Sequence, residues 1–161
     1  MLVRSDIIQN AVDLYNAIGS GPPRVAILSA VETVTSKIPS TIEAAALCKM
    51  ADRGQITGAI LDGPLAFDNA VDVEAAKIKG IHSPVAGRAQ ILVVPDLEAG
   101  NMLAKNLIFL SKADSAGLVL GARVPIVLTS RADSVRSRMA SCAAGVLYAA
   151  ARRAGANLVA A

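Results

Sequence analysis

The sequence predicts a three-layer αβα domain whose central sheet is mainly parallel. Short, continuous apolar runs alternate along the chain with longer segments of helical periodicity, which is the order of elements in parallel α/β sheets. Composition supports this α/β fold class, because 53% of the 161 residues are hydrophobic and only 2% are aromatic. A core built from Ala, Val, Leu and Ile is typical of helices that pack closely on a sheet.

The first predicted elements are a helix and a buried strand. Residues 5–18 have apolar positions at helical spacing, with Ser5 as the expected N-cap and Gly19 just past the end. Residues 24–30 form a short apolar run that follows two prolines. Such a run favours a strand covered on both faces.

A second helix and strand are predicted at residues 40–53 and 56–61. Ser40 and Glu43 have the spacing of a capping box, in which each side chain bonds the backbone N–H of the other residue. The apolar run at 56–61 ends at an Asp-Gly-Pro sequence, residues 62–64, that predicts a turn.

The next pattern combines an alanine-rich helix with the clearest strand in the sequence. The helix is predicted at 67–79 and the strand at 90–95, where the residues are Gln-Ile-Leu-Val-Val-Pro. Asp96 then stands where it would cap a helix at 97–112. Strand, capping acid and helix together predict a βα unit.

Two short strands, the second of them expected to be covered on both faces, and a long helix complete the chain. The strands are predicted at 118–120 and 126–128, and the helix at 134–153, where Arg152 and Arg153 would suit its negative C-terminal end. One face of this helix is apolar and comprises Val135, Met139, Cys142, Ala143, Val146 and Leu147.

Charge and composition exclude several functional classes. The formal net charge is +3, from 16 Lys and Arg against 13 Asp and Glu, without a basic stripe or stacking aromatics, so we expect no nucleic-acid partner. No apolar run reaches the roughly 20 residues that span a bilayer, and the start lacks a signal-peptide pattern, so we expect no membrane partner and a cytoplasmic protein. Cysteine and histidine spacing predicts neither a disulfide framework nor a metal site.

Two helix starts at the carboxyl ends of predicted strands are candidate anion sites. At the first, Gly100 and Asn101 would permit close approach by a ligand, although Asp96 would repel an anion. The alternative for this site is an ordinary N-cap without a ligand.

The second candidate anion site lies at residues 130–134. Arg131 offers a fork of donors that suits phosphate, and the hydroxyls of Ser130 and Ser134 can donate to phosphate oxygens. The alternative is a surface arginine beside a capping serine.

Four motifs in order resemble the phosphate acetyltransferase and phosphate butyryltransferase family. They are Asp-Gly-Pro-Leu-Ala-Phe-Asp-Asn-Ala at 62–70, Ser-Pro-Val-Ala-Gly-Arg at 83–88, Pro-Asp-Leu-Glu-Ala-Gly-Asn at 95–101 and Thr-Ser-Arg-Ala-Asp-Ser at 129–134. Each motif is weak alone, whereas four in order with similar spacing are specific. The last motif looks closer to the butyryltransferase branch and to the acyltransferase part of chains fused to an enoyl-CoA hydratase domain.

This resemblance implies the reaction acyl-CoA + phosphate ⇌ acyl phosphate + CoA. Coenzyme A and phosphate would be substrates, and no cofactor would be bound permanently. The resemblance also implies an isocitrate/isopropylmalate dehydrogenase-like fold, a homodimer, and a cleft between two domains as the active site. In that cleft, Ser130 and Arg131 match the family's Ser-Arg pair near the thioester and phosphate.

One family position differs in this chain. The aspartate proposed in the acetyltransferase branch as the base for the CoA thiol is replaced here by Ser137, which cannot be that base. Asp133 lies four residues earlier and is a possible substitute base, because both residues would share a helical face; it could equally be the cap of the last helix. With Asp96, Gly100, Asn101 and Ser134, Ser137 completes the residues expected to bind the coenzyme.

The resemblance covers only the C-terminal half of the family's length. Residues 1–117 would be the second α/β domain, and residues 118–161 a strand-helix segment that in the family packs back on the first domain. That missing domain would be a partner, and the chain alone would have little activity. The alternative function is a non-catalytic module for CoA or nucleotide binding and dimerisation.

Overall fold

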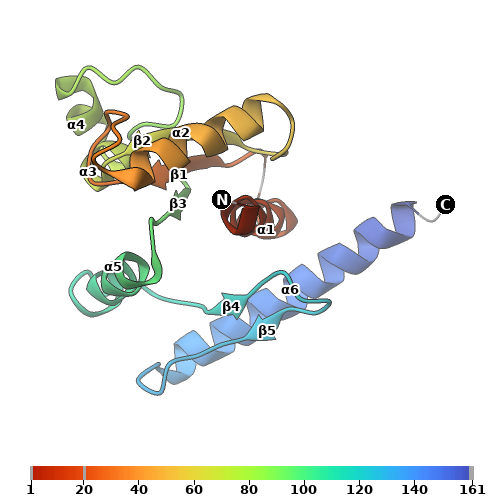
Figure 1. The fold of residues 1–161 in the computed structure, drawn as a ribbon. Helices are drawn as coiled ribbons and strands as arrows, with labels where there is room; N and C mark the ends of the chain where they lie inside the picture. The colour runs from red at the N-terminus through yellow and green to blue at the C-terminus, as the bar shows by residue number, and fades with distance from the viewer. Residues whose placement is uncertain (1, 20, 160–161) are drawn as a thin grey trace.

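A parallel three-stranded sheet forms the centre of the molecule (Figure 1). The computed structural model describes residues 2–19 and 21–159. The strands are β1 (Arg24–Leu28), β2 (Ile60–Leu65) and β3 (Ile91–Val93), in the order β2-β1-β3. Both neighbours pair with β1 in parallel, so the parallel sheet expected from the sequence is confirmed.

Helices and loops cover both faces of this sheet. Helices α1 (Leu2–Ile18) and α2 (Pro39–Asp52) lie on one face, where they form a core with alternate residues of β1. The core residues on this face are Ile8, Val12, Val25, Ile27, Ala44, Leu47, Ile56 and Val93. Helices α3 (Phe67–Val71) and α4 (Val73–Ile78) belong to the core on the other face, which includes Ala26, Leu28, Leu65, Ala70, Ala76, Val85 and Ala86.

The position of β2 corrects the sequence prediction. The strand begins four residues later than expected, and the predicted turn at residues 62–64 lies inside it. Pro64 is tolerated because β2 is an edge strand, where a missing N–H breaks no bond to a further neighbour. Gly63 is required because a Cβ there would lie 2.7 Å from the carbonyl oxygen of Ile27, beside an irregularity in the β1–β2 register.

Two predicted helix caps are also wrong. Ser5 lies within α1 rather than at its start. Helix α2 begins at Pro39, whose missing N–H costs nothing in the first turn, and its N-cap has no side-chain bond. Ser40 bonds the hydroxyl of Ser29 instead, at 2.8 Å, and Glu43 pairs with Arg4. Tertiary contacts therefore replace the predicted capping box.

The predicted helix at 67–79 is divided at Asp72. This residue has extended backbone geometry, and its carboxylate accepts a bond of 2.7 Å from the N–H of Ala75, which caps α4. An aspartate in an alanine-rich run thus ends one helix and begins the next.

The remaining elements lie to one side of the sheet (Figure 1). Helix α5 (Leu97–Phe109) follows β3, and two short strands, β4 (Leu118–Val119) and β5 (Ile126–Val127), form a separate antiparallel ribbon. This ribbon packs against α6 (Val135–Val159), which in turn contacts α1. We call residues 97–159 the C-terminal arm and residues 2–19 and 21–93 the sheet body.

The apolar residues of this arm are more exposed than the sequence predicts. Ile126 is 49% exposed and Leu128 is 62% exposed, so the prediction of a strand covered on both faces is wrong here. A ribbon of two strands that packs on one helix has only one protected face.

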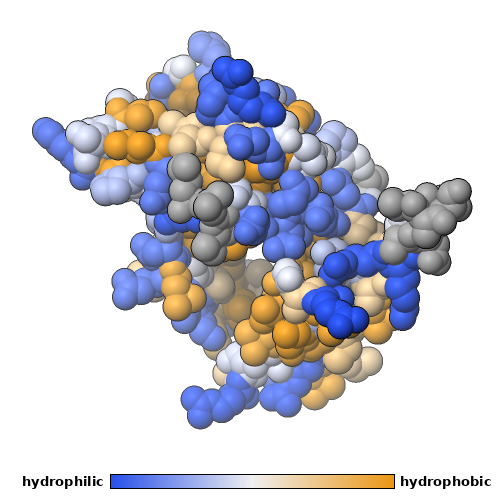
Figure 2. All heavy atoms as spheres, turned by 45° about the vertical axis from the view of Figure 1, so that its right-hand side comes forward, coloured by the Kyte–Doolittle hydropathy of each residue, from blue (hydrophilic) through white to orange (hydrophobic). Residues whose placement is uncertain are grey.

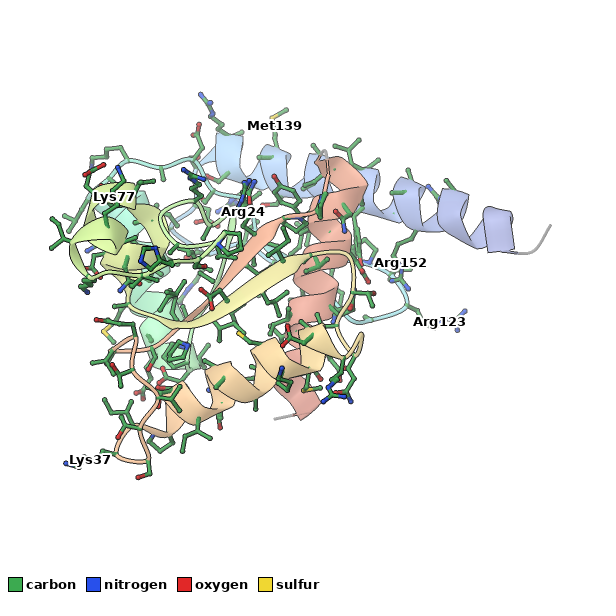
Figure 3. All side chains as sticks on the ribbon, turned by 90° about the horizontal axis from the view of Figure 1, so that it is seen from above. Arg24, Lys37, Lys77, Arg123, Met139 and Arg152 are labelled. Carbon is green, nitrogen blue, oxygen red and sulfur yellow. The ribbon has the colours of Figure 1, made fainter. Side chains whose placement is uncertain are left out.

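The predicted apolar face of α6 also points to solvent. Met139 is 68% exposed and Leu147 is 58% exposed, whereas Ser141 and Tyr148 on the opposite side are buried. Figure 3 shows the Met139 side chain directed away from the sheet. Figure 2 shows hydrophobic side chains exposed on the lower part of the molecule, where the arm lies. None of the helices among the described residues has the length and apolar content to cross a membrane.

Candidate functional site

The turn before α6 contains the predicted catalytic residues. The backbone N–H of Ser130 donates to the Asp133 carboxylate at 2.6 Å, and the N–H of Asp133 donates to the Ser130 carbonyl at 3.1 Å. These bonds close a tight turn around Arg131. Asp133 is half-buried and precedes the helix, so it does not share a helical face with Ser137.

A serine network holds this turn to the segment before β4. Ser134 caps α6, because its hydroxyl accepts a bond of 3.1 Å from the N–H of Ser137. The Ser137 hydroxyl lies 3.1 Å from that of Ser134 and 3.2 Å from that of Ser115. Buried Ser141 accepts from the N–H of Gly117 at 2.9 Å and donates to the Ser137 carbonyl. Ser134, rather than Asp133, is therefore the cap.

Sequence reasoning missed two members of this network. Ser134, Ser137 and Ser141 recur at helical spacing and so lie on one face of α6, a signal that was available in the sequence. Ser115 had no such signal, because only the tertiary structure brings it against the helix.

Positive charge surrounds the same turn. The Arg131 side chain is exposed and makes no ion pair or hydrogen bond with the described residues. Arg138 donates to the Arg131 carbonyl at 3.4 Å, while Arg136 is neutralised by Asp114 at 2.6 Å. Arg131 and Arg138 form no ion pair with the described residues, and two such guanidinium groups beside a helix N-terminus can attract a phosphate.

The second predicted site has the geometry of an N-cap. The Asp96 carboxylate accepts a bond of 2.7 Å from the N–H of Ala99. A Cβ at Gly100 would lie 2.9 Å from a methyl carbon of Val94, so this glycine permits helix and strand to approach. Asn101 is exposed on α5. These contacts support the alternative given for this site, an ordinary helix N-cap.

A cavity of about 330 Å³ lies beside this cap, at the carboxyl ends of the parallel strands. Ser29 follows β1, Phe67 follows β2, and Pro95 follows β3, so all three strands contribute to it. The complete lining is Leu28, Ser29, Ala30, Phe67, Val94, Pro95, Ala99 and Leu103. Ligands collect at this edge of parallel sheets, which makes Ser29 and Phe67 candidates that sequence reasoning missed.

Two of the sequence motifs meet in the structure. The backbone N–H groups of Gly87 and Ala89 donate to the carbonyls of Asn69 and Ala70, at 2.8 and 3.2 Å. The Asn69 side chain is fully buried, and its amide donates to Glu32 at 3.3 Å. The motifs at 62–70 and 83–88 therefore form one packed unit around the end of β2.

The two predicted anion sites, by contrast, are not joined. Within the described part of the chain, no hydrogen bond or ion pair links residues 96–101 to residues 130–137. The same residues contain no group of three or more His, Cys, Asp and Glu side chains placed to hold a metal.

Two electrostatic features lie outside these sites. A hydrogen bond from Lys79 lowers the pKa of Asp68 and raises that of Lys79, which ties α3 to the end of α4. Burial, and then the nearby carboxylates of Asp62 and Asp52, raise the pKa of the Cys48 thiol to about 12. Cys48 is therefore a protonated, half-buried thiol that packs against the core.

Comparison with known proteins decides the family. Residues 4–146 match the family described as Phosphate acetyl/butaryl transferase. This chain belongs to that family. The phosphate acetyltransferase of Rhizobium meliloti is 82% identical over 94% of this chain and 48% of its own length. The probable phosphate butyryltransferase of Bacillus subtilis is 52% identical over 87% of the chain and 47% of its own length.

The fold is also similar to that of a solved structure. The branched-chain phosphotransacylase from Enterococcus faecalis V583 superposes with a TM-score of 0.82 at 34% identity, over 91% of this chain and 54% of that one. The chain thus spans about half the length of the relatives it matches. Relatives named acetyltransferase and butyryltransferase both match, and the higher identity belongs to the acetyltransferase.

Proposed function

We propose that this chain is one half of a phosphate acyltransferase that catalyses acyl-CoA + phosphate ⇌ acyl phosphate + CoA. The observation that carries the proposal is the family match over residues 4–146, together with relatives named for this activity. Coenzyme A and inorganic phosphate are the substrates, and the acyl group is short. No permanently bound cofactor is part of the proposal.

The proposed chemistry centres on Arg131. A phosphate oxygen attacks the thioester carbonyl, the C–S bond breaks, and the thiolate of CoA leaves. Arg131 neutralises the phosphate, while Ser130 steadies the developing negative charge. The guanidinium of Arg131 supports this role, because it is exposed beside the start of α6 and forms no ion pair with the described residues.

Asp133 is the proposed base for the CoA thiol in the reverse direction. One of its carboxylate oxygens is used by the Ser130 N–H, which leaves the other to accept a proton. Ser137 is bonded to other serines and would contact the coenzyme, together with Ser134, Asp96, Gly100 and Asn101.

The family resemblance extends the proposal to architecture. Residues 1–117 form the second domain of an isocitrate/isopropylmalate dehydrogenase-like enzyme, and residues 118–161 pack on a first domain that supplies the other wall of the cleft. The exposed apolar face of α6 supports this division, because a partner would bury Met139 and Leu147. We further propose a cytoplasmic homodimer.

A second candidate function is a non-catalytic module that binds CoA or a nucleotide. Ser137 favours it, because this hydroxyl occupies the family's aspartate position and is bonded to Ser134 and Ser115. The two candidate functions differ in their expected response to an added first domain, which would restore acyl transfer in a half-enzyme and would not do so in a binding module.

The test measures acyl phosphate formation from acetyl-CoA and butyryl-CoA. We expect the 161-residue chain alone to be nearly inactive, and activity to be recovered when the N-terminal half of the Rhizobium meliloti relative is added. Arg131→Ala should then lower the recovered rate by about a hundredfold, whereas the control Arg53→Ala, on an exposed arginine at the end of α2, should not.

Two outcomes would contradict this picture. Appreciable turnover by the chain alone would refute the half-enzyme, and failure to recover activity would favour the binding module. An unchanged rate and pH profile in Asp133→Asn would remove Asp133 as the base.

A further inference from the structure

A polar cleft of about 590 Å³ lies between α1, the β4–β5 loop and α6. Asn10, Asp13 and Asn16 line it from α1, Gly121 from the loop, and Arg152 from α6. The Asp13 carboxylate accepts a bond of 2.8 Å from Gln9 and retains its second oxygen for a ligand. This wall offers an acceptor and two amides to a ligand with hydroxyl or amino groups.

A second hollow, of about 250 Å³, adjoins the first across Arg152. Its walls include three arginines, Arg123, Arg152 and Arg153, with no acidic residue in its lining. Among the described residues, none of these arginines forms an ion pair. Figure 3 shows Arg123 and Arg152 at the same side of α6.

Arg152 is held in place between the two hollows. Its guanidinium donates to the Ala122 carbonyl at 3.0 Å and lies 5.8 Å from the ring centroid of Tyr148, which is 3% exposed. A pinned guanidinium loses little entropy when it binds a further anion.

The helix dipole does not account for this arginine cluster. The sequence predicted that Arg152 and Arg153 would complement the C-terminal end of the last helix, but α6 continues to Val159 and has no basic residue in its last turn. The dipole effect fades within the last turn, so it does not explain why Arg152 and Arg153 lie together here.

We propose that the two hollows together bind a nucleotide. The three guanidinium groups take its phosphates, and the wall with Asp13 and Asn10 takes its ribose hydroxyls and base. A simple anion would fill only the arginine hollow and would be repelled by Asp13. The site lies apart from Arg131 and does not rest on the proposed acyl transfer.

The test is calorimetric titration of the 161-residue chain with ADP, coenzyme A and inorganic pyrophosphate. We expect saturable binding of ADP, tighter than that of pyrophosphate and weakened by added salt. Arg123→Gln and Arg153→Gln should each weaken ADP binding about tenfold, and the control Arg53→Gln should leave it unchanged. Among the described residues, neither the Arg123 nor the Arg153 side chain forms a hydrogen bond or ion pair, so we expect both variants to fold.

A further variant separates the two parts of the site. Asp13→Asn should weaken ADP while leaving pyrophosphate unchanged or tighter. If coenzyme A binds more tightly than ADP and Arg123→Gln weakens its binding, the natural ligand is the nucleotide part of the coenzyme. If coenzyme A binds as tightly as ADP or more weakly, the natural ligand is a free nucleotide. Absence of saturable ADP binding, or ADP binding that is unchanged in both arginine variants, would overturn the proposal.

Discussion

Similar apolar sequence patterns are buried in the sheet body and exposed in the C-terminal arm. In the body, four of the five residues of β1 are buried, and the sheet has a core on each face. In the arm, α5 has no buried residue and both residues of β5 are exposed. An apolar pattern thus indicates which face requires a partner, but does not show that this chain supplies it.

The physical reason for the difference is the number of neighbours. Strand β1 pairs on both edges and is covered on both faces, so each apolar side chain leaves water when the body folds. The arm contains a two-stranded ribbon and one long helix, which can cover each other on one side only. We therefore expect stability to reside in the body, and the following predictions test that contrast.

The largest effect is expected for a core leucine of the body. Leu47 is fully buried, and Leu47→Ala should lower the free energy of unfolding by about 3 kcal/mol through lost burial and a residual cavity. The matched variant Leu147→Ala, on the exposed face of α6, should change it by less than about 0.5 kcal/mol. Urea unfolding measures both, and equal losses would show that the arm is packed as firmly as the body.

Replacing a glycine by alanine should lower the stability in the sheet body and raise it in the C-terminal arm. Gly87 has φ +73°, and a Cβ there would lie 2.5 Å from the Cα of Val73, so Gly87→Ala should cost about 2 kcal/mol. Gly155, within α6, has no atom within 4 Å of an added Cβ. Gly155→Ala should therefore stabilise the protein by up to about 1 kcal/mol through helix propensity. Thermal unfolding distinguishes the two, and destabilisation by Gly155→Ala would reveal an unrecognised contact.

The serine network ties α6 to the segment before β4. Ser141→Ala would leave the partly buried N–H of Gly117 without its acceptor, so we expect a loss of about 1 kcal/mol. Ser134→Gly, which removes a cap while keeping a favourable residue there, should cost only a few tenths of a kcal/mol. Amide exchange at Gly117 is the direct measurement, and unchanged protection in Ser141→Ala would contradict this role.

The smallest effect concerns the two cysteines. Cys142 is exposed on the arm and should react rapidly with a disulfide reagent at pH 8, whereas Cys48, which is half-buried and has a raised pKa, should react much more slowly. The folded-state pKa of Cys48 is raised from 9.0 to about 12, so its contribution to stability is present below pH 9 and is lost as the pH rises toward 12. Cys48→Ala should make the stability less sensitive to pH in that range, and labelling of Cys48 as rapid as that of Cys142 at pH 8 would contradict its raised pKa.

The sequence predicted the parts of the fold that depend on local pattern. Alternating strands and helices, a strand predicted at 24–30 and observed at Arg24–Leu28, and the Asp96 cap followed from apolar runs and capping chemistry, because those signals lie within a few residues. The motifs at 62–70, 83–88, 95–101 and 129–134 led to the family, and the match over residues 4–146 confirmed it.

Long-range contacts decided the rest. The strand through Gly63 and Pro64 depends on the backbone of β1, and the loss of the predicted capping box depends on Ser29 and Arg4 from other elements. The buried side of α6 is the opposite of the predicted one, because the side with Ser141 and Tyr148 packs against other elements of this chain and the more apolar side does not. The arginines of the nucleotide site likewise come from the β4–β5 loop and from the helix, a meeting that only the tertiary structure produces.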